Sequence, residues 1–95
     1  MSQLASTEYH VYRPWTEVVD YYHEEMRKKG WKLEREYTEN VGDSSVRHFV
    51  DTCMVYTRFP GFVASIDLSG VVENGTPTAT SVIVYTIMKD YISCQ

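Results

Sequence analysis

Residues 13–31 read RPWTEVVDYYHEEMRKKGW and predict the only convincing helix of the chain. Thr16 is the expected N-cap, because its hydroxyl can accept a hydrogen bond from a backbone N–H of the first turn. Gly30 follows three basic residues and is expected as the C′ residue that ends the helix. The apolar side chains fall within an arc of about 100°, the width that a helix packs against a sheet. They are Trp15, Val18, Val19, Tyr22 and Met26.

The rest of the sequence predicts strands joined by turns. A short alternating stretch at 8–13 precedes the helix, and Asn74-Gly75 predicts a hairpin turn near the end of the chain. A bulge near Asp51 is expected, because Asp51 and Thr52 interrupt an otherwise apolar strand. The four strands predicted after the helix cover residues 31–38, 46–59, 62–69 and 78–91.

The predicted fold class is therefore α+β. One helix lies on a curved antiparallel sheet in the order strand, helix and four strands, which is the general architecture of cystatin-like folds. The 95 residues form a single domain, and residues 1–7 are small, polar and expected to be disordered.

Charge and hydropathy exclude some function classes. The net charge of −4 makes nucleic acid an unlikely partner, because phosphate binding requires a basic surface. The basic residues of the 27–35 segment are diluted by glutamates, so nucleic-acid binding there is the least favoured hypothesis. No apolar run has the length of a membrane span, and the first residues do not resemble a secretory signal. A cytoplasmic location is expected.

The helix segment resembles a family of small uncharacterised bacterial domains that often occur in lipoproteins. Val18, Tyr21 and Tyr22 match a V-x-x-[FY]-Y helix, and Gly30-Trp31 match the G-W pair that follows it. The resemblance covers about the first third of the chain and implies a small α+β module without an established activity. The leader and lipidated cysteine of the secreted members are not seen in this sequence.

The last predicted strand is apolar on both of its faces. Val82, Val84 and Met88 alternate with Ile83, Tyr85 and Ile87, which is the pattern of a strand covered on both sides. One helix can cover only one face of the sheet. The sequence therefore predicts a non-enzymatic interaction module that forms a homodimer, with Ile83, Tyr85 and Ile87 as the interface.

The alternative is a protein or enzyme that binds a small apolar ligand. A helix over a curved sheet can leave a cup lined by aromatic side chains. The candidate rings for this pocket are Trp15, Tyr22, Trp31, Phe49 and Phe62, with Tyr85 beside them. The same rings can also simply fill the core.

No pattern of chemically reactive side chains predicts catalysis, a metal or a cofactor. The histidines, His10, His23 and His48, have no metal-ligand spacing. His48 and Cys53 have opposite parity in one strand, so they point to opposite faces and cannot form a nucleophile–base pair. Cys53 and Cys94 permit a disulfide that the sequence does not indicate, and Cys53 is expected as a small buried side chain.

Overall fold

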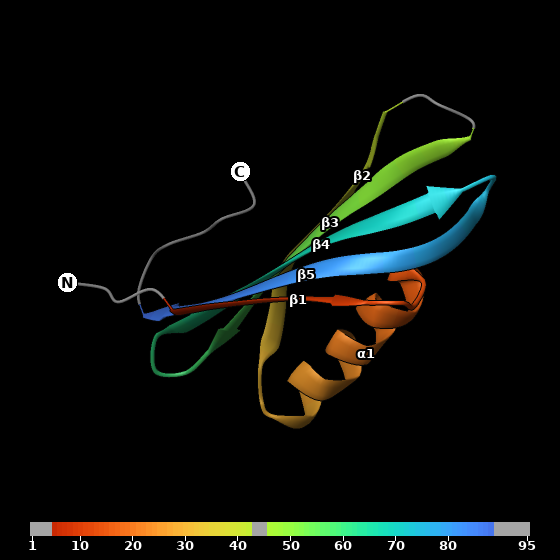
Figure 1. Ribbon diagram of the computed structural model, residues 1–95. Helices are drawn as coiled ribbons and strands as arrows, with labels where there is room; N and C mark the ends of the chain where they lie inside the picture. Colours follow the sequence, from red (N-terminus) through yellow and green to blue (C-terminus); the bar gives the residue numbers. More distant parts are fainter. Residues whose placement is uncertain (1–4, 43–45, 89–95) are drawn as a thin grey trace.

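The computed structural model describes residues 5–42 and 46–88 and confirms the predicted α+β class (Figure 1). One helix packs on a five-stranded antiparallel sheet. The elements in chain order are β1 (Ala5–Val11), α1 (Trp15–Lys28), β2 (Lys32–Val41), β3 (Arg47–Arg58), β4 (Phe62–Glu73) and β5 (Thr76–Met88).

The spatial order of the strands is β1-β5-β4-β3-β2 (Figure 1). Each of β2, β3 and β4 pairs with the next strand along the chain, and β5 also pairs with β1. β5 lies between β1 and β4 and is not an edge, but strands beside it in the sheet do not cover its faces, so its second apolar face is not explained by this position. The edges of the sheet are β1 and β2.

The main core lies between α1 and one face of the sheet, here called the inner face. Val18 and Val19 of the helix are buried against Met54, Ile66 and Val82, none of which exposes any surface. Half-buried side chains complete this cluster. They are Tyr9, Val11, Trp15, Tyr22, Met26, Trp31 and Val84.

The first residue of α1 touches the sheet at a glycine. A Cβ added to Gly70 would stand only 2.7 Å from Cγ of Trp15, so the indole lies directly on the backbone of β4. The hydroxyl of Thr80 donates a 2.8 Å hydrogen bond to the carbonyl of Arg13, which anchors the turn before the helix. These two contacts fix where α1 enters the inner face.

The predicted N-cap is wrong by two residues. The helix begins at Trp15, and Pro14 is the N-cap without any side-chain hydrogen bond. The carbonyl of Pro14 accepts from the N–H groups of Glu17 (3.1 Å) and Val18 (3.2 Å). Proline already holds the φ angle that leads into a helix, so the chain turns before Thr16 can cap it.

The predicted helix end is confirmed. Gly30 has a φ of +85°, a conformation that glycine adopts without steric cost. The N–H of Gly30 donates to the carbonyl of Arg27 (3.1 Å), and the N–H of Trp31 donates to that of Met26 (3.0 Å). This is a Schellman motif, which satisfies carbonyls that have no partner inside the helix.

Two expectations about the strands are wrong. The first strand begins at Ala5, inside the stretch expected to be disordered, because residues 5–7 pair with 84–86 of β5. β3 runs through Asp51 in unbroken register, so it has no bulge there. Thr52 is tolerated on the inner face because its hydroxyl lies 3.2 Å from that of Thr38. The irregularities lie instead between Leu33 and Arg35 and between Val71 and Val72.

Replacing Gly70 by alanine should destabilise the fold by about 1–3 kcal/mol, the usual cost of overpacking a core. The new methyl group would force Trp15, and with it the first turn of α1, away from the sheet. Urea unfolding of Gly70→Ala measures this. The matched control is Gly61→Ala, where no atom lies within 4 Å of an added Cβ. Equal stability of the two variants would contradict the prediction.

Candidate functional site

The face of the sheet opposite α1 is here called the outer face. Its side chains belong to residues that directly precede or follow the core residues in the sequence. Since side chains alternate along a strand, Cys53, Asp67 and Ile83 point away from the helix. Cross-strand pairing places them in one row that crosses all five strands. The row is Tyr37, Cys53, Asp67, Ile83 and Glu8.

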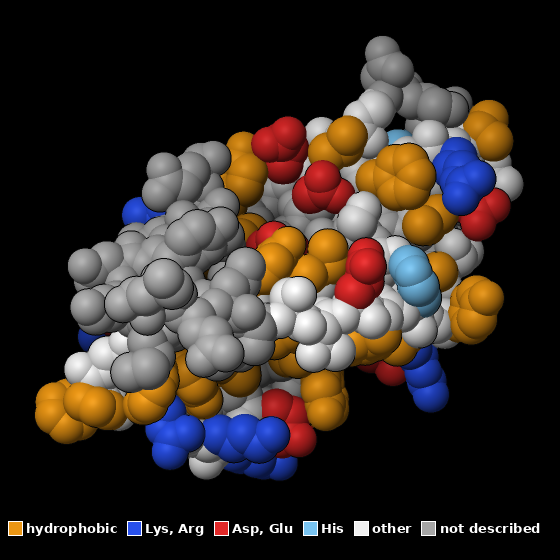
Figure 2. Space-filling model, turned by 60° about the vertical axis from the view of Figure 1, so that its left-hand side comes forward, with side chains coloured by type: hydrophobic (Ala, Val, Ile, Leu, Met, Phe, Trp, Pro, Cys, Tyr) orange, Lys and Arg blue, Asp and Glu red, His pale blue; other side chains and the backbone are white. Residues whose placement is uncertain are grey.

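This row crosses a groove of about 710 Å³ on the outer face. Carboxylates and apolar groups both line the groove, and the molecular surface in Figure 2 has acidic side chains directly beside apolar ones. The side chains that matter for the argument are Arg35, Tyr37, Glu39, Asp51, Cys53, Asp67 and Ile83.

Asp67 is the most perturbed acid of the groove. Burial raises the pKa of its carboxyl, and the nearby Asp51 carboxylate raises it further. The hydroxyl of Ser65, which donates to Oδ1 of Asp67 over 3.4 Å, acts in the opposite direction. A half-buried carboxylate beside another carboxylate opposes folding, so its presence suggests a role other than stability.

Tyr37 is held over the groove by its neighbour two residues on. Its hydroxyl donates a 2.8 Å hydrogen bond to Oε2 of Glu39, and this bond is the main cause of the raised pKa of Tyr37. The ring is 57% exposed, which is a large apolar surface to leave in water. Tyrosines in this state are typical of contact surfaces.

Two of the three predicted interface residues, Ile83 and Tyr85, lie on the outer face. Ile83 and Tyr85 are both half-buried, and Ile83 lines the groove. Ile87 pairs through its backbone with Val63, and its side chain lies outside the described part of the structure. Beside them, Val55 and Val63 form a second, smaller apolar cluster with Cys53.

The rings predicted to line an apolar cup do not all come together. Trp15, Tyr22 and Trp31 pack into the main core. Phe49 is 39% exposed on the outer face, with the guanidinium of Arg47 5.8 Å from its ring centre. Phe62 lines a separate hollow at the β3–β4 turn. Parity thus separates Phe49 from the rings under α1, because it sends Phe49 to the opposite side of the sheet.

Sequence reasoning did not single out Tyr37, Asp51 and Asp67 as members of one site. The signal was available in part. Counting back from the turn at residues 59–61 pairs Cys53 with Asp67, as the structure does. The placement of Tyr37 beside them depends on the irregularity in β2, which no residue pattern announced.

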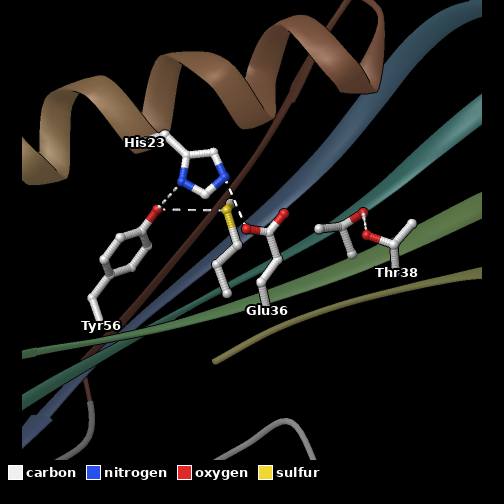
Figure 3. A network of polar contacts seen from close by, with 6 residues as sticks. His23, Glu36, Thr38 and Tyr56 are labelled. Carbon is white, nitrogen blue, oxygen red and sulfur yellow. Dashed lines mark hydrogen bonds and ion pairs between the residues drawn. The ribbon is translucent and has the colours of Figure 1, made fainter. Parts of the chain in front are cut away.

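A polar network connects the helix to the inner face near its rim (Figure 3). Nε2 of His23 lies 2.9 Å from Oε1 of Glu36, and Nδ1 lies 3.1 Å from the hydroxyl of Tyr56. Because a carboxylate can only accept, Nε2 carries the proton, and in the neutral ring Nδ1 accepts from Tyr56. The sulfur of Met54 is 3.6 Å from the same hydroxyl.

This network acts as a clamp rather than as a catalytic relay. Burial, with the charge of Glu36, raises the pKa of Tyr56 to about 12. The phenol therefore stays protonated at neutral pH and serves only as a donor. His23 comes from α1, Glu36 from β2 and Tyr56 from β3. The three hydrogen-bonded side chains therefore tie the helix to the sheet.

The structure also bears on metal binding, on membrane crossing and on the state of Cys53. Within residues 5–42 and 46–88, no three His, Cys, Asp or Glu side chains gather closely enough to hold a metal ion. The helix that the structure describes is too short or too polar to cross a membrane. Cys53 takes part in a disulfide bond, which corrects the expectation of a free buried thiol, and Cys94 lies outside the described residues.

No family model, curated protein or solved structure matches this chain. The likeness of the helix segment to small bacterial domains and of the architecture to cystatin-like folds stays a prediction.

Replacing Asp67 by asparagine should raise the free energy of unfolding at pH 7 by less than about 1 kcal/mol, because solvent still screens the charge. A raised folded-state pKa means that stability falls as pH rises from the unfolded pKa through the folded one. The gain should therefore vanish at about pH 3, where the carboxyl is protonated in both states. Urea titrations at the two pH values measure it, and a variant less stable than wild type at pH 7 would contradict it.

Replacing Tyr56 by phenylalanine should flatten the loss of stability at high pH. The pKa of the Tyr56 hydroxyl is 10.0 in the unfolded chain and about 12 in the folded chain. Wild type therefore loses stability as the pH rises across that interval. The variant also loses the hydrogen bond to His23, at about 1 kcal/mol near neutral pH. Thermal unfolding across this interval measures the first effect, and thermal unfolding at neutral pH measures the second. Tyr12→Phe, on a ring that is 92% exposed, is the control and should keep the wild-type slope.

Proposed function

We propose that this protein is a non-enzymatic interaction module that binds a protein partner through the outer face of its sheet. The single observation that supports this proposal is the position of Ile83 and Tyr85. They lie on β5, which has a strand on each side, and on the outer face, which is opposite α1. Ile83 also lines the groove.

The surroundings of these residues support a protein partner over a small ligand. Protein interfaces combine a partly apolar centre with a polar rim, and tyrosine is enriched among the residues that contribute most. Ile83 and the exposed ring of Tyr37 provide apolar surface in the groove, and Glu39, Asp51 and Ser81 provide polar groups along it. The residues that line the groove come from β2, β3, β4 and β5, so a bound segment could contact several strands at once.

The charge of the groove selects the kind of partner. Glu39, Asp51 and Asp67 contribute negative charge and Arg35 contributes positive charge, so a segment with lysine or arginine side chains is complementary. Two copies placed outer face to outer face would bring like carboxylates together. A homodimer through Ile83 and Tyr85, with Ile87, is therefore proposed as an acid-dependent second mode, favoured once Asp67 is protonated.

Titration with peptides tests this proposal. The probe is a short peptide that alternates lysine with tyrosine, and its matched control has glutamate in place of each lysine. Amide chemical shifts of the outer-face strands should move with the lysine peptide only, and Asp51→Asn with Asp67→Asn should weaken binding several-fold. Glu24→Gln, on the helix, should bind like wild type.

Two results would overturn the proposal. One is equal binding of the two peptides, and the other is a set of shifted amides on α1 instead of the outer face. A concentration series without peptide, at pH 7 and in mild acid, reports on the second mode. Amide signals of residues 83 and 85 that broaden only in acid, and not in Ile83→Lys, would support it.

A further inference from the structure

β2 is an edge strand whose outward side is open. It is paired on one side with β3, and in the described part of the chain no strand pairs with its other side. All ten of its residues are exposed. Alternate N–H and C=O groups along such a strand point away from the sheet and can form a new antiparallel ladder.

We propose that a second copy of this chain pairs with β2 edge to edge, antiparallel, about a two-fold axis at Tyr37. In this register Tyr37 faces Tyr37 of the second copy. Arg35 faces Glu39 of the second copy, and Glu39 faces its Arg35, because residues at equal distances from the axis lie opposite each other. All of these side chains lie on the outer face, where opposed pairs come into contact.

The other registers near the centre of β2 are less favourable. A two-fold axis must pass through a residue, because an axis between residues would oppose side chains of different faces. An axis at Arg35, Glu36 or Glu39 would place each of these charges opposite its own copy. An axis at Thr38 avoids repulsion but forms no ion pair. The axis at Tyr37 is the one that creates two opposite-charge pairs.

The same features protect the edge from unrelated strands. Half of the residues of β2 are charged, and the register shift between Leu33 and Arg35 breaks the regular edge at its start. Both features normally discourage edge-to-edge association. Residues 35–39 can still form a regular ladder. When this segment pairs antiparallel with a second copy of itself, Arg35 lies opposite Glu39, so opposite charges meet.

The existing contacts of these side chains are compatible with the pairing. Arg35 already interacts within its own chain, but a guanidinium has five donors and can serve a second carboxylate. One oxygen of Glu39 accepts from the hydroxyl of Tyr37, which leaves further acceptor capacity on the carboxylate. The hydrogen bond also holds both side chains beside the axis.

The pairing has a clear geometric result. A two-fold axis perpendicular to the sheet places both helices on one side and both outer faces on the other. The two sheets become one ten-stranded sheet, and the two acidic grooves, each lined by Arg35, Tyr37 and Glu39, lie next to each other. This inference does not depend on the partner proposed for the outer face.

Charge reversal in single variants and in their mixture tests the register. Wild type should dimerise with increasing concentration in sedimentation velocity. Arg35→Glu alone, or Glu39→Arg alone, should weaken the dimer about tenfold, since two cross-strand pairs change from attraction to repulsion. An equimolar mixture of the two variants should recover the wild-type affinity as a heterodimer, because both opposed pairs are then Glu–Arg.

Matched controls come from the exposed ion pair of the helix. Arg27→Glu and Glu24→Arg make the same charge changes on α1, where Arg27 and Glu24 lie 2.8 Å apart, and should dimerise like wild type. The proposal is overturned by a wild type that stays monomeric at millimolar concentration, by single variants that dimerise like wild type, or by a mixture that does not recover. A groove that fails to bind the lysine peptide would leave these results unchanged.

Discussion

The contact between the indole of Trp15 and the backbone of β4 at Gly70 is the constraint on which the rest of the structure depends. Any larger residue at position 70 would hold the first turn of α1 away from the sheet. Since the apolar stripe of α1 is one helical face, the position of its first residue decides which sheet residues the others meet. The hydrogen bond from Thr80 to Arg13 and the clamp of His23, Glu36 and Tyr56 then hold the helix along its length.

Once the helix is placed, the two faces of the sheet have different roles. The inner face carries the main core, into which Trp15, Tyr22 and Trp31 pack. The outer face carries the groove, a smaller apolar cluster at Val55 and Val63, and the half-buried carboxylate of Asp67. Val55 and Val63 are buried, so this part of the outer face contributes to folding, and the groove beside it is the surface for which we propose binding.

The outer face and the β2 edge share side chains. Arg35, Tyr37 and Glu39 line the groove and also lie along the open strand. The charges of these residues have opposite effects on self-association at the outer face and at the β2 edge. Across the outer face, carboxylates of two copies would repel one another, whereas along the edge the alternation of arginine and glutamate is complementary to itself. The same residues thus carry both proposals, a foreign basic partner on one surface and a second copy on the other.

Local patterns in the sequence determined the helix, its glycine end, the order of the elements and the parity that sends Ile83 and Tyr85 away from the core. Each of these depends on residues that are close in the sequence, and their spacing follows the period of a helix or of a strand. Strand ends, the N-cap at Pro14 and the absence of a bulge at Asp51 required the pairing of distant segments. The groove of Tyr37, Asp51 and Asp67 and the contact of Trp15 with Gly70 were decided only by tertiary structure, because their members meet through strand register and helix docking, which no local period encodes.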